Sequence, residues 1–189
     1  MSPAAADRRP AALSADERRT LLRVARESIA THLAGRPPHV PPATGALAER
    51  RGVFVTLRRK DGELRGCVGL MRSDTSLLDA VARMAVAAAV EDDRFTPVTA
   101  AELRELEVEI SALGPLEPIR AEDVKVGQHG LLVSSGSRRG VLLPQVPGEH
   151  GWDRETFLAH TCGKAGLPAD AWKDPGVELL AFTAEVFGE

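Results

Sequence analysis

A cysteine stands between two glycines in the stretch LRGCVGL, residues 64–70, of a chain that contains only two cysteines. Arg65 lies two residues before Cys67, and Gly66 and Gly69 leave the backbone bare on either side. Glycines in a strand let a ligand or another backbone come close. A thiol beside guanidinium groups is expected to have a lowered pKa, and the thiolate is its reactive form. These residue types suggest cysteine chemistry, or anion binding, at Cys67.

A β-hairpin over residues 52–70 is predicted to position this stretch. Asp61-Gly62 is a strong two-residue turn signal, and apolar residues two apart on both sides suit strands with one buried face. If only these two residues form the loop, Lys60 faces Glu63 and every later pair follows. The buried face then consists of Val53, Val55, Leu57, Gly66, Val68 and Leu70.

The other face of the predicted hairpin is polar. The register places Arg58 opposite Arg65, and further along the strands it places Thr56 opposite Cys67. Like charges that face each other on a sheet are unfavourable, so either water and Glu63 or a bound anion must neutralise them. Cys67 is then a nucleophile, a general acid or a ligand in an anion-accepting pocket. Alternatively, it is a small buried residue under a neighbouring element.

A buried helix is expected over about residues 77–90, because this alanine-rich segment is apolar almost all round. The segment ends in Glu91, Asp92 and Asp93, whose carboxylates oppose the helix dipole. Two explanations are open. Either Arg94 neutralises a solvated acidic end, or one of the acids faces the hairpin arginines and completes a site.

The second half of the chain is inferred to repeat the first, as β-hairpin, helix, short helix and strand over about residues 52–113 and 129–187. Aligning Gly66 with Gly140 places Val141 at the position of Cys67. The thiol therefore belongs to the first copy alone. The same offset aligns the alternating strand of the first copy with a single closing strand, so that Val108, Ile110 and Ala112 match Phe182, Ala184 and Val186. Residues 1–12 are expected to be mobile, and residues 13–189 to form one domain.

Composition limits the functional classes. The 189 residues carry a formal net charge of -3, with a pI near 6.0, which gives no general reason to bind nucleic acid or membrane. The N-terminus lacks the apolar core of a signal peptide, so a cytoplasmic protein is expected. Cys162 shares the apolar face of a helix predicted to begin at Asp153, and is expected in the core. No motif assigns a cofactor, and no cysteine or histidine spacing suggests a metal.

Five segments together resemble the AMMECR domain family: LRGCVGL, EDDRFTPVT, ELEVEIS, VLLPQV and GWDRETFLAHTCGKAGLPADAW. The resemblance covers about residues 21–187. It implies an α+β fold made of a duplicated unit around a barrel-like, mostly antiparallel sheet, preceded by an N-terminal helix, with the LRGCVG signature at a cleft. It also implies association, through gene neighbourhood, with a Memo-type protein and a radical S-adenosylmethionine enzyme.

Two functional hypotheses follow. In the first, the protein is a cysteine-dependent enzyme or enzyme component acting with these two partners. Cys67 is then the nucleophile or acid/base, Arg58 and Arg65 orient an anionic group, and Asp92 positions or relays a proton. In the second, it is a non-catalytic binding module whose cleft holds a small anionic ligand, a peptide or a protein partner. The remaining candidate binding residues are Thr56, Gly66, Gly69, Glu91, Arg94 and Gln145.

Overall fold

The computed structural model describes residues 10–189, and the chain divides into two compact units. The first unit runs to Leu113 and also contains the C-terminal Glu185–Glu189, whereas the second comprises Gly114–Ala184. The second unit is therefore an insertion between two strands of the first. Most of the predicted mobile N-terminus lies outside the described residues. Within them, Ala11 donates a backbone hydrogen bond to Glu49 at 3.3 Å.

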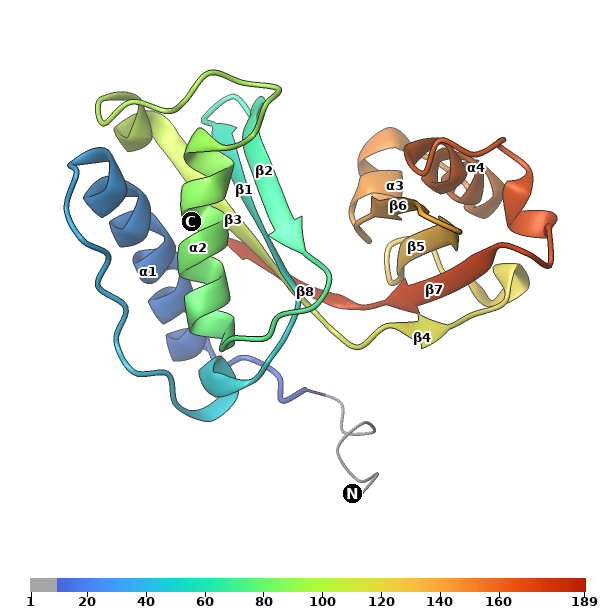
Figure 1. The fold of residues 1–189 in the computed structure, drawn as a ribbon, viewed down its shortest axis with the longest axis horizontal. Helices are drawn as coiled ribbons and strands as arrows, with labels where there is room; N and C mark the ends of the chain where they lie inside the picture. The colour runs from blue at the N-terminus through green and yellow to red at the C-terminus, as the bar shows by residue number, and fades with distance from the viewer. Residues whose placement is uncertain (1–9) are drawn as a thin grey trace. The chain divides into compact units, whose positions relative to one another are not determined.

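The first unit is a four-stranded sheet, sheet A, with the strand order β2-β1-β3-β8. Two helices pack side by side over one of its faces (Figure 1). The elements are α1 (Ala15–Leu33), β1 (Val53–Arg59), β2 (Leu64–Leu70), α2 (Leu77–Val90), β3 (Leu106–Leu113) and β8 (Ala184–Gly188), with short 3-10 turns at Gly45–Ala48 and Glu102–Glu105. The core lies between sheet and helices, where Val55, Leu57 and Ile110 are fully buried.

Both helices of the first unit begin at the residues that the sequence indicates. Ser14 caps α1, and its side chain and that of Glu17 satisfy each other's backbone N–H groups in the predicted capping box. Ser76 caps α2, which is apolar almost all round, as expected of a buried helix.

The second unit is another four-stranded sheet, sheet B, with the order β4-β7-β5-β6. Its elements are β4 (Glu117–Pro118), β5 (Gly130–Ser135), β6 (Arg138–Leu142), α3 (Val146–His150), α4 (Arg154–Lys164) and β7 (Glu178–Phe182), with 3-10 turns at Ala121–Asp123 and Ala171–Lys173. Asp153 caps α4, as predicted. Cys162 is fully buried there, as predicted. The α+β class is confirmed, but in the described residues both sheets are open and neither closes into a barrel.

The predicted closing strand over residues 178–187 is in fact two strands. β7 ends at Phe182 in sheet B, and β8 begins at Ala184 in sheet A. The apolar alternation continues through Thr183, so the pattern contains no sign that the chain changes sheets. The prediction of one strand is therefore wrong, because period-two alternation reports faces and not partners.

The two sheets share one strand order, since β2-β1-β3-β8 corresponds to β6-β5-β7-β4. When Gly66 is matched to Gly140, the ladders match Val108 to Leu179. The predicted match of Val108 to Phe182 is therefore wrong by three residues. The predicted repeat boundaries stay predictions.

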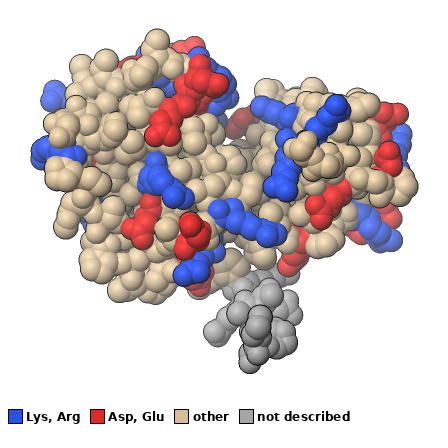
Figure 2. Space-filling view, in the orientation of Figure 1, with Lys and Arg blue, Asp and Glu red and all other residues tan. Residues whose placement is uncertain are grey.

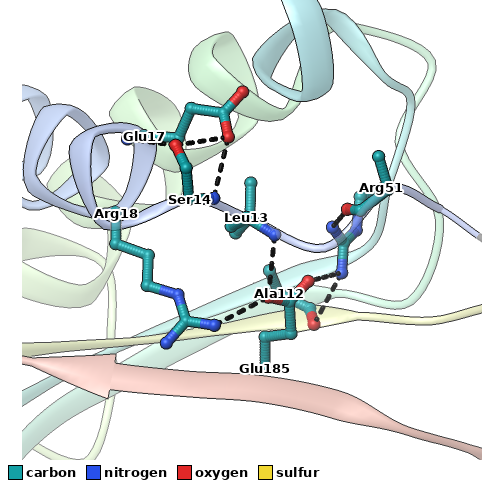
Figure 3. A network of polar contacts seen from close by, with 8 residues as sticks. Leu13, Ser14, Glu17, Arg18, Arg51, Ala112 and Glu185 are labelled. Carbon is teal, nitrogen blue, oxygen red and sulfur yellow. Dashed lines mark hydrogen bonds and ion pairs between the residues drawn. The ribbon is translucent and has the colours of Figure 1, made fainter.

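A polar network holds β8 to the rest of the first unit (Figure 3). Glu185 Oε2 accepts hydrogen bonds from the Leu13 backbone N–H at 3.0 Å and from Arg18 at 3.1 Å. Its Oε1 accepts one from Arg51 at 3.0 Å. The Arg51 side chain is 5% exposed and also donates to the Ala112 carbonyl at 3.3 Å. The strand that returns from the second unit is thus fixed by charge as well as by backbone pairing.

The surface gives no strong electrostatic signal. On the face shown in Figure 2, basic and acidic side chains are interspersed, without a large patch of either sign. Among residues 10–189, no helix is long and apolar enough to cross a membrane. The same residues contain no group of three or more histidine, cysteine, aspartate or glutamate side chains arranged to hold a metal ion.

Candidate functional site

The β1–β2 hairpin carries Cys67 on the face of sheet A that points away from the helices. Thr56 lies opposite Cys67, as predicted, and its hydroxyl donates a hydrogen bond to Cys67 Sγ at 3.3 Å. Nearer the turn the register shifts, so that Arg58 faces Leu64 and Arg65 becomes the extra residue of a β-bulge. The predicted pairing of Arg58 with Arg65 is therefore wrong.

The turn causes this shift. The Arg59 N–H donates to the Glu63 carbonyl at 2.9 Å, so the loop contains the three residues 60–62 instead of the predicted two, and Lys60 does not face Glu63. One extra residue in the loop is balanced by one extra residue in β2. The bulge restores the predicted register beyond it, which is why Cys67 keeps its predicted partner.

Burial dominates the chemistry of the Cys67 thiol. It raises the pKa of Cys67, although the hydrogen bond from Thr56 and the charge of Arg94 act in the opposite direction. The carboxylates of Asp92 and Glu109 raise the pKa further. The predicted lowering of this pKa is therefore wrong. Near pH 7 the group is a neutral thiol, which is a weak hydrogen-bond donor and a poor nucleophile.

Asp92 and Arg94 form a clip on the outer edge of β2. Asp92 Oδ2 accepts a hydrogen bond from the Cys67 backbone N–H at 2.8 Å, and Arg94 Nη2 donates one to the Cys67 carbonyl at 3.2 Å. Arg94 also binds both carboxylate oxygens of Asp92, at 2.7 and 2.8 Å. The clip occupies backbone groups that would otherwise be open to another strand.

Both explanations offered for the acidic end of α2 hold in part. Arg94 neutralises Asp92, and Asp92 reaches the hairpin as well, although through a backbone N–H and not through the arginines. The hydrogen bonds from Arg94 lower the pKa of Asp92 to about 2, against the opposing effect of burial. Asp92 is therefore ionised at neutral pH and does not readily accept a proton there.

Arg65 belongs to a second contact between the two sequence motifs. Its side chain is 6% exposed, and it donates to the two carboxylate oxygens of Glu102 at 2.6 and 3.0 Å. It also donates to the Thr96 carbonyl at 2.9 Å, and its guanidinium carbon lies 5.8 Å from the centre of the Phe95 ring. Arg65 is neutralised within the fold and is not among the charges that shift the pKa of Cys67.

Neither glycine of the motif opens the backbone to a ligand. A Cβ at Gly66 would lie 2.1 Å from the Ala88 carbonyl oxygen, so α2 occupies that space. A Cβ at Gly69 would lie 2.3 Å from the ring of Phe54. At Gly140, the counterpart of Gly66, a Cβ would lie 2.4 Å from a backbone nitrogen that follows α4. Close packing of a helical segment on a strand glycine is thus common to both units.

The remaining candidate residues are placed on three different elements. Arg58 donates to the Gly62 carbonyl at 3.2 Å, within the turn of the hairpin. Glu91 is the C-cap of α2 and lines a cavity beside α1. Gln145 is the N-cap of α3, in the second unit.

Glu109 is a candidate residue that the sequence analysis did not identify. It lies in β3 opposite Thr56, so Thr56, Cys67 and Glu109 form a row across three strands on one face, which we call the polar row. Glu109 Oε1 is buried and has no hydrogen-bond partner among the described residues. Buried polar atoms nearly always have one. The alternation in ELEVEIS, which places its glutamates on one face, was the available signal.

The second unit has apolar residues at the three positions of the polar row. In its ladders Leu132 lies between Val141 and Leu180, as Thr56 lies between the other two members of the row. Because sheet B has the same strand order, this architecture does not require polar residues there. The polar row is therefore the feature that distinguishes the first unit.

These features define a class of α+β protein with two similarly ordered sheets, one of which presents a cysteine-centred polar row beside a clipped edge strand. The AMMECR1 family model matches residues 22–187. The chain belongs to the AMMECR1 family, as the sequence motifs indicate.

Similar proteins occur in archaea. A protein of Methanothermobacter thermautotrophicus is 45% identical over 191 residues, which cover 95% of this chain and 97% of that protein. A protein of Thermococcus gammatolerans is 48% identical over 184 residues, with 89% and 88% covered. The crystal structure of an uncharacterized protein from Pyrococcus horikoshii is similar with a TM-score of 0.85, at 45% identity and 89% coverage of each chain.

Proposed function

We propose that this protein is a non-catalytic binding module whose recognition surface is the polar row of sheet A. One observation carries the proposal: Glu109 Oε1 is buried and unpaired among the described residues, in a row that is apolar in the second unit. A buried acceptor without a partner is costly, and a bound group that supplies an N–H or O–H donor removes the cost. The row therefore suits a partner that donates hydrogen bonds.

An anionic partner fits this site less well than the sequence alone suggests. The guanidinium groups of Arg65 and Arg94 are already paired with Glu102 and Asp92. Cys67 is a neutral thiol and Glu109 contributes an acceptor, so the local chemistry favours amide, hydroxyl or ammonium groups.

The family resemblance supplies candidate partners for this surface. Gene neighbourhood associates such proteins with a Memo-type protein and a radical S-adenosylmethionine enzyme. We assign this protein the role of an adaptor that presents the polar row to one of them.

Co-purification with each candidate partner tests the proposal. Glu109→Leu copies the counterpart residue Leu180 and should weaken binding at least about tenfold. Its melting temperature should stay the same or rise, because the change removes an unsatisfied buried acceptor. Glu107→Leu alters an exposed glutamate two residues away on the same strand and should leave binding unchanged. Equal binding by wild type and Glu109→Leu would contradict the proposal.

Cysteine-dependent catalysis is the second candidate, and one contact favours it. The Thr56 hydroxyl donates to Cys67 Sγ, which stabilises a thiolate once one forms. In a reconstituted mixture of the three proteins, Cys67→Ser would then abolish turnover while partner binding persists. Turnover that survives Cys67→Ser excludes catalysis by this residue.

A further inference from the structure

A cavity of about 350 Å³ lies in the first unit between α1, α2 and the connector that follows α1. None of its lining residues belongs to a strand, so it is separate from the polar row. Its apolar walls are Pro38, Val40, Ala82 and Val86. Cavities that hold small molecules begin at about 300 Å³. The volume suits one molecule of metabolite size.

Ser28 gives this cavity an unsatisfied polar group. The residue is only 7% exposed, lies near the middle of α1 and lines the cavity. Within the described part of the chain its hydroxyl has no hydrogen-bond partner. A buried hydroxyl normally bonds to the protein or to water. The Ser28 hydroxyl is therefore available to a molecule inside the cavity.

Two exposed guanidinium groups stand at the rim of the cavity. Arg36 and Arg83 line it, and neither forms an ion pair among residues 10–189. Two acids also line it, but Asp79 already accepts a hydrogen bond at 2.5 Å from the hydroxyl that caps α2. Glu91, at the other end of α2, is the one acid left to oppose the two arginines. The imidazole of His32 adds a further donor.

We propose that this cavity binds a small carboxylate with an apolar body. The apolar walls enclose the body, the Ser28 hydroxyl binds a polar atom on it, and Arg36 and Arg83 bind the carboxylate. Guanidinium groups bind carboxylates through paired, charge-assisted hydrogen bonds, which are stronger than neutral ones. The excess of unpaired cations selects an anion over a cation of the same length.

Three probes of equal chain length separate charge from apolar burial: octanoate, octanol and octylammonium. Each is titrated into the full chain at pH 7 and followed by chemical-shift changes at α1 and α2. Octanoate should bind about tenfold more tightly than octylammonium, with octanol between them. Tighter or equal binding of octylammonium would overturn the assignment of the ligand class.

Two kinds of variant locate the binding. Arg83→Gln should reduce octanoate affinity about fivefold and leave octanol unaffected, whereas the matched change Arg104→Gln, at an exposed arginine outside the cavity, should alter neither. Val86→Phe should fill the cavity and abolish binding of all three probes, and Ala82→Leu serves the same purpose if that variant does not fold. Octanoate binding that persists in the filled variant, or that ignores Arg83→Gln, would refute the site. Glu109→Leu should not change it, which separates this test from that of the polar row.

Discussion

Replacing Gly66 with alanine should destabilise the fold by about 2 kcal/mol, because this glycine serves helix packing. The new Cβ would lie 2.1 Å from the Ala88 carbonyl oxygen, where contacts below 3.0 Å are essentially never seen. Strand and helix would have to separate by about 0.9 Å, against a carbonyl that cannot rotate away. Overpacking of this kind costs about 3 kcal/mol at its upper end. The lower entropy of the unfolded alanine chain offsets about 0.7 kcal/mol of that cost.

Urea unfolding followed by circular dichroism measures this effect. With a slope of about 2 kcal/mol/M, the midpoint should fall by about 1 M. Gly140→Ala should lower stability in the same way, since its Cβ would lie 2.4 Å from backbone. Gly163→Ala is the matched control, because its Cβ meets nothing within 4 Å in α4, and it should add about 0.5–1 kcal/mol. If Gly66→Ala keeps wild-type stability but loses partner binding, the glycine exists to admit a ligand and the packing argument fails.

Three further outcomes follow from the contacts described above. Asp92→Asn should cost about 2 kcal/mol at pH 7, because a folded-state pKa of about 2 lies below the ordinary 3.8. That contribution is present above pH 4 and is lost as the pH falls through the folded-state pKa, so the difference from wild type should shrink to under about 1 kcal/mol at pH 2.5, and a constant difference would contradict the assignment. Iodoacetamide should label Cys67 with a pH midpoint above that of free cysteine, with the fully buried Cys162 unlabelled in the folded protein, whereas a midpoint below about 8.5 would show an activated thiolate. Arg51→Met should cost about 3 kcal/mol because it leaves a carboxylate of β8 and two carbonyls without their donor, and Arg19→Met, at an exposed pair, under about 0.5 kcal/mol; equal effects would argue against the network of Figure 3.

Local signals in the sequence predict most of the elements of this fold. The caps at Ser14 and Asp153, the apolar helix over residues 77–90 and the two hairpins all depend on residues close together in the chain. Caps and turns satisfy nearby backbone groups, so their chemistry is visible in short segments. The placement of Cys67 beside Thr56 also follows from local alternation.

The errors concern partners that are distant in sequence. Arg65 pairs with Glu102, 37 residues away, and nothing in the strand announces that carboxylate. The raised pKa of Cys67 reflects burial, which depends on packing that no strand pattern specifies. Glu109 escaped notice for the same reason, since an unpaired carboxylate is recognised only when its surroundings are known.

The second unit shows what the bulge in β2 does. Arg139 aligns with Arg65 when the two hairpins are matched, yet it lies in a regular ladder opposite Ser134 and is exposed. Arg65 occupies a bulge and is 5% exposed against Glu102. A bulge re-aims one side chain without disturbing the pairs beyond it. The three-residue loop therefore turns a solvent-facing arginine into an anchor for the segment after α2, and within LRGC it leaves the Cys67 side chain, on the polar row, as the part for which the fold supplies no ion pair and no helix contact.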